Sequence, residues 1–171
     1  LSALELKRVR TKFGMVFQQA ALFDSMTNFD NVAFPLREHT KLKKAEIEAR
    51  ARELMQLFSL DPDDVGPRFP SEISGGQRKR VGLARAVALD PSIVLYDEPT
   101  TGLDPITTDQ VDEMILQAKA KLGVTSIVIS HDIASAFNIA DQILFIYKGE
   151  VVARGLQRDL LASEHPFVRQ F

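Results

Sequence analysis

The sequence predicts an α/β fold with a mainly parallel sheet and a helical subdomain inserted into it. Two short apolar runs, residues 92–96 (SIVLY) and 124–130 (VTSIVIS), are typical of buried strands, and a helical pattern separates them. The first of these runs suits a central strand that is buried on both faces. Residues 24–90 contain helical patterns but no strong strand, so we expect the helical insert there.

The first half of the chain is predicted to contain one strand and two helices. Residues 13–18 (FGMVFQ) are predicted to form a short buried strand, and the polar residues 24–31 a loop. A helix is expected at 41–58 because apolar residues recur there at three- and four-residue spacing. Residues 61–70 hold three prolines and a glycine and are expected to be a loop. The second helix is expected over residues 74–89.

The second half continues the alternation of strands and helices. The expected elements after residue 96 are a helix at 108–122 ended by Gly123, the strand at 124–130, a short helix at 133–140, a hairpin of residues 142–147 and 150–153 around Lys148 and Gly149, and a terminal helix at 159–171 interrupted at Pro166.

The composition is that of an ordinary globular domain, with 45% apolar residues, 26% charged residues and a net charge of −2. Basic and acidic residues are interspersed, so no basic stripe points to nucleic acid as a partner. The chain has no cysteine, which excludes disulfides and thiolate metal sites. No apolar run approaches the roughly 20 residues that span a bilayer.

Two adjacent carboxylates, Asp97 and Glu98, follow the predicted strand at 92–96, in the segment IVLYDEPTTGLD. Ligands of open α/β sheets gather at the carboxyl ends of strands. We expect Asp97 to hold Mg²⁺ through water, because Mg²⁺ binds few protein carboxylates and keeps much of its hydration. We expect Glu98 to polarise a water for attack on a phosphate. A solvated loop is the alternative for an isolated Asp-Glu pair.

The segment Ser74-Gly75-Gly76-Gln77 opens the second predicted helix. Ser74 and Gln77 have the spacing of a capping box. Glycines at a helix N-terminus let backbone amides approach a ligand closely, and the helix dipole favours an anion there. The segment therefore fits either a well-capped helix or a phosphate-binding helix terminus.

Two further polar residues stand at strand ends. His131 directly follows the strand at 124–130, 34 residues after Asp97, and Gln18 closes the strand at 13–18. Either residue could be an ordinary surface side chain, and Gln19 adjoins Gln18, so the functional glutamine could be either of the two.

Taken in chain order, the motifs at Gln18, at residues 74–77, at residues 93–104 and at His131 resemble four motifs of ABC ATPases. These are the Q-loop, the signature, the Walker B segment with the D-loop, and the switch histidine. ABC ATPases have a P-loop NTPase fold. The resemblance implies that Gln18 reaches towards Mg²⁺ and the attacking water, and that His131 contacts the γ-phosphate of ATP. It also implies that residues 74–77 bind ATP held by a second subunit and that Asp104 helps to couple the two sites. Residues 1–23 and 91–171 would form a RecA-like core, with 24–90 as the signature subdomain.

Three segments, FQQAALFDSMTNFDNVAFPLREHT, GLDPIT and HPFVRQF, are similar to the ATPase subunit of Mla-type transporters, which move phospholipids between bacterial membranes. Related importers have similar Q-loop regions. The resemblance implies a homodimer of ATPase subunits, a transmembrane permease as partner, and a cytoplasmic position, peripheral on the inner membrane.

The phosphate-binding motif G-x-x-x-x-G-K-[ST] does not occur in the 171 residues. Because the first residue is Leu1, we expect the chain to begin inside a longer protein. We expect these residues alone to show no measurable ATP affinity, and to self-associate through an apolar edge and face of the sheet.

Two other classes of protein are compatible with parts of the sequence. An ATP-independent interaction module would explain the missing phosphate-binding motif, but the presence of Asp97, Glu98, Gln18 and His131 argues against it. A DNA-repair or chromosome-structuring ATPase would have a long coiled coil between the first two motifs. Only 55 residues separate Gln18 from Ser74, without sustained heptads.

Overall fold

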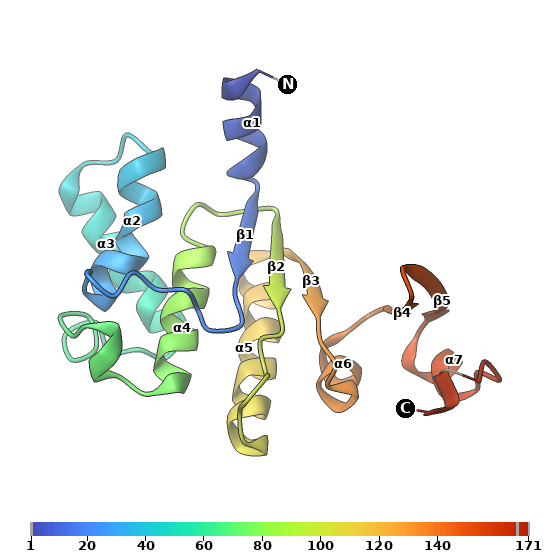
Figure 1. The fold of residues 1–171 in the computed structure, drawn as a ribbon. Helices are drawn as coiled ribbons and strands as arrows, with labels where there is room; N and C mark the ends of the chain where they lie inside the picture. Colours follow the sequence, from blue (N-terminus) through green and yellow to red (C-terminus); the bar gives the residue numbers. More distant parts are fainter. Residues whose placement is uncertain (1, 167, 171) are drawn as a thin grey trace.

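The computed structural model describes residues 2–166 and 168–170 and centres on a three-stranded parallel sheet. In spatial order its strands are β1 (Phe13–Val16), β2 (Ile93–Asp97) and β3 (Thr125–Ile129) (Figure 1). Met15 lies opposite Leu95, and Leu95 lies opposite Ile127. The predicted α/β class with a parallel sheet is confirmed.

The other elements are helices and one antiparallel hairpin. Their bounds are α1 Ala3–Arg10, α2 Asn28–His39, α3 Lys44–Leu57, α4 Gly75–Ala86, α5 Pro105–Leu122, α6 Ile133–Ile139, β4 Ile143–Tyr147, β5 Glu150–Gly155 and α7 Gln157–Leu161, with 3₁₀ turns at Pro70–Glu72 and Val168–Gln170. In Figure 1, α2, α3 and α4 gather beside β1, whereas α5 runs behind the strands. None of the helices described is long and apolar enough to cross a membrane.

Helices α3 to α6 and the hairpin lie where the sequence predicts them, but α1 and α2 are additional. Helix α2 begins inside the stretch predicted as a loop, because its polar residues cap and brace a helix. Thr27 Oγ1 accepts a hydrogen bond from the backbone N–H of Asp30 at 3.0 Å. The buried Asn31 side chain accepts from the N–H of Phe23 at 2.8 Å and donates to its carbonyl at 3.1 Å.

The first strand and the terminal helix differ from their predictions. The first strand ends at Val16 and not at residue 18. The terminal helix predicted at 159–171 is wrong, since α7 ends at Leu161 and only a 3₁₀ turn follows at Val168–Gln170. Pro166 lies between them and has no backbone N–H to continue a helix. Residues 167 and 171 of that prediction lie outside the described residues.

The prediction that the strands at 92–96 and 124–130 are buried is correct for one face of the sheet only. Val94 and Tyr96 are buried in a core that α4 and α5 help to form. The opposite face carries Met15, Ile127 and Ile129, which are 42%, 50% and 62% exposed. Strand periodicity could not show this difference, because an uncovered apolar face has the same sequence pattern as a covered one.

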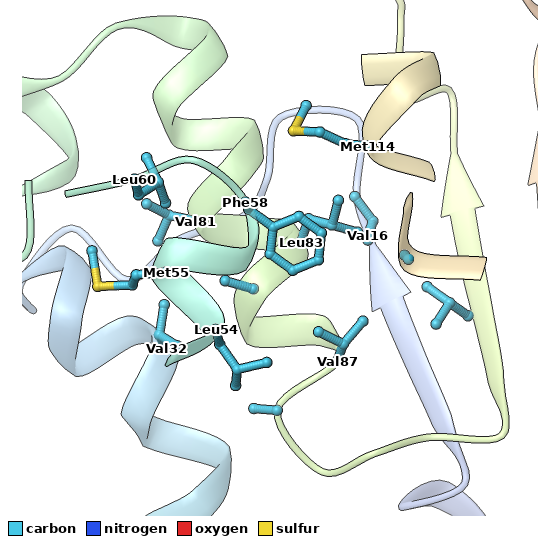
Figure 2. Close-up of a cluster of buried hydrophobic side chains, with 14 of the residues drawn as sticks. Val16, Val32, Leu54, Met55, Phe58, Leu60, Val81, Leu83, Val87 and Met114 are labelled. Carbon is cyan, nitrogen blue, oxygen red and sulfur yellow. The ribbon is translucent and has the colours of Figure 1, made fainter. Parts of the chain in front are cut away.

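The main core lies where α2, α3 and α4 pack together and against β1 (Figure 2). The apolar stripe of α3 contributes Leu54 and the following Phe58, and α4 contributes Val81. Val16 of β1 belongs to the same cluster, so the helical segment and the sheet share one continuous core. This packing fixes α4 beside the strand whose end carries Gln18.

Replacing Phe58 by Ala should lower the free energy of unfolding by about 3–5 kcal/mol, because a ring that is 1% exposed leaves a cavity in this core. Urea unfolding followed by circular dichroism would measure the loss. Phe69, which is 43% exposed, provides the control, and Phe69→Ala should cost clearly less. Equal losses in the two variants would contradict the importance of this packing.

Candidate functional site

Three of the predicted motifs come together at one edge of the sheet. β1, β2 and β3 are parallel, and their arrowheads point the same way in Figure 1. Gln18 follows β1, Asp97 ends β2, and His131 follows β3. The carboxyl edge of the sheet is where open α/β folds bind ligands.

Glu98 and His131 are in direct contact at this edge. His131 Nδ1 lies 2.7 Å from Glu98 Oε2, and Thr101 Oγ1 donates to the same oxygen at 2.9 Å. A carboxylate only accepts hydrogen bonds, so Nδ1 donates, and Nε2 is the nitrogen left to face a ligand. The Glu98 side chain is 24% exposed and that of His131 is 72% exposed. The pair is therefore anchored on one side and open on the other.

The backbone of Glu98 is in the left-handed region, with φ +49°. A residue with a side chain adopts this conformation at a cost of roughly 1–2 kcal/mol. The N–H of Glu98 donates to the carbonyl of Ile129 at 2.9 Å, so β3 holds the residue in place. Uncommon backbone conformations that neighbouring structure maintains are frequent at functional sites.

Asp97 is the oxygen donor best placed for a metal ion. It is the last residue of β2 and is partly exposed. The described part of the chain has no cluster of three or more His, Asp or Glu side chains that could enclose a metal. A single carboxylate at a strand end is compatible with Mg²⁺, which takes its other ligands from water and from phosphates.

Gln18 lies in an exposed turn after β1, with Phe17 between it and the end of the strand. Gln19 is exposed on the same turn. The structure thus places Gln18 beyond the strand, whereas the sequence predicts it as the closing residue of the strand.

The N-terminus of α4 has the predicted capping box. Ser74 Oγ accepts from the N–H of Gln77 at 3.2 Å, and Gln77 Oε1 accepts from the N–H of Ser74 at 3.0 Å. A side-chain carbon at Gly75 or at Gly76 would come no nearer than 3.7 Å to other atoms. Packing within this chain therefore does not require either glycine.

Lys79 of α4 was not singled out in the sequence as a site residue. Its ammonium donates to the carbonyl of Pro99, directly after Glu98, and burial lowers the pKa of Lys79. No hydrogen bond among the described residues joins residues 74–77 to Glu98 or His131. The helix is thus tied to the loop after β2, while its N-terminus stays separate from the Glu98–His131 pair.

The family model for ABC transporters matches residues 1–101 of this chain, well over half of its length. The chain belongs to the ABC transporter family. It is 46% identical to the probable ribonucleotide transport ATP-binding protein mkl of Mycobacterium leprae, over 99% of this chain and 48% of mkl. It is 44% identical to the intermembrane phospholipid transport system ATP-binding protein MlaF of Haemophilus influenzae, over 100% of this chain and 64% of MlaF.

This ABC transporter chain spans about half the length of mkl and less than two thirds of MlaF. Among solved structures it resembles the dimeric, post-hydrolysis ATP-binding cassette MJ0796 bound to ADP and Pi, with TM-score 0.78 and 33% identity over 91% of this chain and 68% of that one. It also resembles cbiO1 of Clostridium perfringens, with TM-score 0.85 and 26% identity over 99% and 66%. The predicted family resemblance is confirmed.

Asp104, in the D-loop position of this ABC chain, is engaged as the N-cap of α5. Its carboxylate accepts from the N–H of Thr107 at 3.0 Å and from Thr107 Oγ1 at 2.6 Å. These hydrogen bonds lower the pKa of Asp104. Within this chain the residue orders the start of α5, where the methyl group of Thr107 would lie 3.7 Å from a side-chain carbon placed at Gly76.

The loop that carries His131 is fixed by α6 against α5. Asp132 caps α6 by accepting from the N–H of Ser135 at 3.1 Å. Ser135 Oγ donates to Asp112 of α5 at 2.5 Å, and both of these side chains are buried. Burial raises the pKa of Asp112, and the charges of Asp132 and Asp109 raise it further. A buried acidic group thus anchors the helix that follows His131.

Replacing Asp112 by Asn should make stability less dependent on pH. Folding raises the pKa of Asp112, so its contribution to stability is complete below about pH 4, its unfolded value, and is lost as pH rises through the folded pKa. The amide of Asp112→Asn keeps an acceptor for Ser135 without a buried charge, so unfolding free energies measured in urea should fall less between pH 4 and neutral pH.

The control for this experiment is Glu113→Gln, which changes the exposed neighbouring carboxylate of α5. It should keep the pH dependence of the original chain. The same pH dependence in the Asp112→Asn variant and the original chain would rule out Asp112 as a source of this effect.

Proposed function

We propose that this chain is part of the ATP-binding and ATP-hydrolysing subunit of an ABC transporter, with ATP and Mg²⁺ as cofactors. The observation that carries the proposal is the 2.7 Å contact between Glu98 and His131 at the carboxyl end of the central strand. A carboxylate held in this way is suited to take a proton from a water that attacks a phosphate. Family membership and the ADP- and Pi-bound relative support nucleotide chemistry.

In the proposed mechanism each residue at the sheet edge has a separate task. Asp97 and Gln18 are the residues that would hold Mg²⁺, and Gln18 would also orient the attacking water. Glu98 accepts the proton of that water. His131, as an imidazolium with a proton on each ring nitrogen, keeps Glu98 in position through Nδ1 and donates through Nε2 to the charge that develops on the transferred phosphoryl group. Mg²⁺, when bound, stabilises the charge on phosphate oxygens.

The N-terminus of α4 is proposed to act on ATP held by a second copy of the subunit. A side-chain carbon at Gly75 or Gly76 would make only ordinary contact within this chain, at 3.7 Å, and its absence lets backbone amides and the helix dipole approach an anion from another chain. Ser74 and Gln77 keep this terminus ordered, and Asp104 lies at the start of the adjoining helix and would couple the two sites. The dimeric state of MJ0796 supports this homodimer.

A transmembrane permease is the proposed second partner, with the ATPase peripheral on the cytoplasmic side of the inner membrane. A hollow of about 670 Å³ lies between β1, α2 and α4, close to the turn that carries Gln18. Its walls include the apolar side chains of Phe13, Phe17 and Leu89, and the basic side chains of Lys7, Arg10 and Arg85 also line it. An apolar hollow of this kind suits a short amphipathic helix of a membrane protein. Nucleic acid is not a proposed partner, because the net charge of the chain is −2.

The transported substrate is proposed to be phospholipid. The MlaF proteins of Haemophilus influenzae and Escherichia coli match the whole chain at 44% and 40% identity, and their names specify intermembrane phospholipid transport. The mycobacterial mkl proteins match at 46% and are named for probable ribonucleotide transport. We favour phospholipid over ribonucleotide as the substrate because three segments of the chain, one of which contains Gln18, resemble the ATPase subunit of Mla-type transporters.

We also propose the division of the chain into an ATPase core, residues 1–23 and 91–171, and a signature subdomain, residues 24–90. All described strands lie in the first two ranges, and α2 to α4 lie in the third. The absence of the G-x-x-x-x-G-K-[ST] motif from the 171 residues means that the phosphate grip expected of the family has no counterpart here.

The 171 residues alone should show no measurable affinity for ATP, because the backbone cradle and lysine that hold phosphates are lacking. Isothermal titration with Mg²⁺ and ATP would measure this. The complete protein serves as the positive control. Micromolar binding by the 171 residues would show that the sheet edge described above grips nucleotide by itself.

In the complete transporter, Glu98→Gln should reduce ATP turnover by about 10²-fold or more while ATP binding remains, because the amide cannot accept the proton. Phosphate release would measure turnover, and transfer of labelled phospholipid between vesicles should be lost in parallel.

Glu113→Gln on the exposed side of α5 is the matched control and should retain turnover. Unchanged hydrolysis in Glu98→Gln would remove Glu98 from the catalytic role. A complete protein without ATP turnover would favour an ATP-independent interaction module, and transfer of ribonucleotides alone would favour the function named for mkl.

A further inference from the structure

The turn after β1 has an uncommon backbone that the proposed mechanism does not explain. Ala20 and Ala21 have φ values of +61° and +45°, although both residues carry a side chain. This left-handed region favours glycine, so two consecutive alanines there need support from the surroundings. Ala20 is only 1% exposed, and Gln18 precedes it by two residues on the same turn.

Arg85, in the last turn of α4, supplies that support. Its Nη2 donates to the carbonyl of Ala20 at 2.7 Å, and its Nη1 donates to the carbonyl of Ala21 at 2.9 Å. The guanidinium also lies over the ring of Phe23, 5.6 Å from the centroid. The planar fork of an arginine can reach two acceptors at once, which a lysine ammonium does less well. No carboxylate among the described residues forms an ion pair with Arg85.

Gly82, three residues earlier on α4, faces the same turn. A side-chain carbon at Gly82 would lie 2.9 Å from Cβ and 3.3 Å from Cα of Ala20, closer than such atoms normally approach. Residues three apart on a helix lie on one face. Hydrogen bonds from Arg85 and close packing at Gly82 therefore hold the same two alanines from one side.

We propose that Arg85 is a positioning residue that holds the left-handed turn at Ala20 and Ala21 and thereby places Gln18 at the carboxyl edge of the sheet. Its catalytic consequence rests on the proposed function of Gln18. Helix α4 then acts at two strand-end loops, through Arg85 on the turn after β1 and through Lys79 on the carbonyl of Pro99 after β2. Its N-terminus is also the signature, so one rigid element sets the relative positions of three parts of the site.

The test uses the complete protein with Arg85→Met, which keeps an apolar side chain beside Phe23. It removes the two hydrogen bonds to the turn and a longer one, at 3.4 Å, from Nη1 to Asn31 Oδ1. Amide hydrogen exchange over residues 17–23 should accelerate by about tenfold or more, because the turn opens more often. The kcat for ATP should fall by about tenfold while KM changes by less than about threefold, since Gln18 is misplaced and the nucleotide contacts are kept. Exchange in α3 and α5 should stay unchanged.

Arg52→Met is the matched control. Arg52 also donates two hydrogen bonds from a helix, at 2.8 and 2.7 Å, but to Asp63 on the surface. This variant should leave exchange over residues 17–23 and kcat as they are. Faster exchange throughout the protein after Arg85→Met, without a local effect, would overturn the proposal in favour of a general structural role.

A second pair of variants tests the turn without touching Arg85. Gly82→Ala should raise exchange over residues 17–23 and lower kcat, because the added carbon displaces Ala20. Combining it with Ala20→Gly removes the clash and allows the positive φ, so the double variant should recover both readouts. These variants decide the matter if Arg85→Met does not fold.

Unchanged exchange at the turn in both single variants would overturn the proposal, and so would faster exchange with an unaltered kcat. Absence of ATP turnover in the unmodified complete protein would instead refute the proposed function. In that case the exchange measurements alone would still show whether Arg85 and Gly82 hold the turn.

Discussion

Parallel pairing of three short strands is the constraint on which the rest of this structure depends. Because β1, β2 and β3 run in one direction, residues from three distant parts of the sequence arrive at one edge. A shift of one residue in the register of β2 would turn Asp97 to the other face of the sheet and would move Glu98 away from His131. The core beneath the sheet maintains this register, since Val94 and Tyr96 are buried against the helices.

Helix α4 is the element that converts this sheet edge into an ordered site. It packs against α2, α3 and β1, and so its polar residues are held at defined positions along the boundary of the core. Lys79 and Arg85 both donate to backbone carbonyls of loops, which is where a strand-end conformation needs support. Glu98 and Ala20 have left-handed backbones, and hydrogen bonds with neighbouring elements hold both residues, through the carbonyl of Ile129 for Glu98 and through Arg85 for Ala20.

The sequence predicted much of the fold because its signals are local. The stripe of α3, the capping box at Ser74 and Gln77, and the Lys148–Gly149 hairpin each depend on residues close together in the chain, and each is present. Helix α2 was missed because Asn31 and its polar neighbours have the composition of a loop. Asn31 accepts a hydrogen bond from the backbone of Phe23, and Asn28 donates one to the carbonyl of Val65. These contacts form only in the folded chain, so the local sequence does not reveal them.

By itself the sequence determined the residue types and their order: carboxylates after an apolar run, glycines at a capped helix start, a histidine after the next strand. The tertiary structure decided which of these residues touch. His131 contacts Glu98, and Arg85 contacts Ala20, although the residues of each pair are more than 30 positions apart in the sequence. The tertiary structure also leaves one apolar face of the sheet exposed. Such contacts depend on packing and register, and short-range patterns in a sequence do not encode either one.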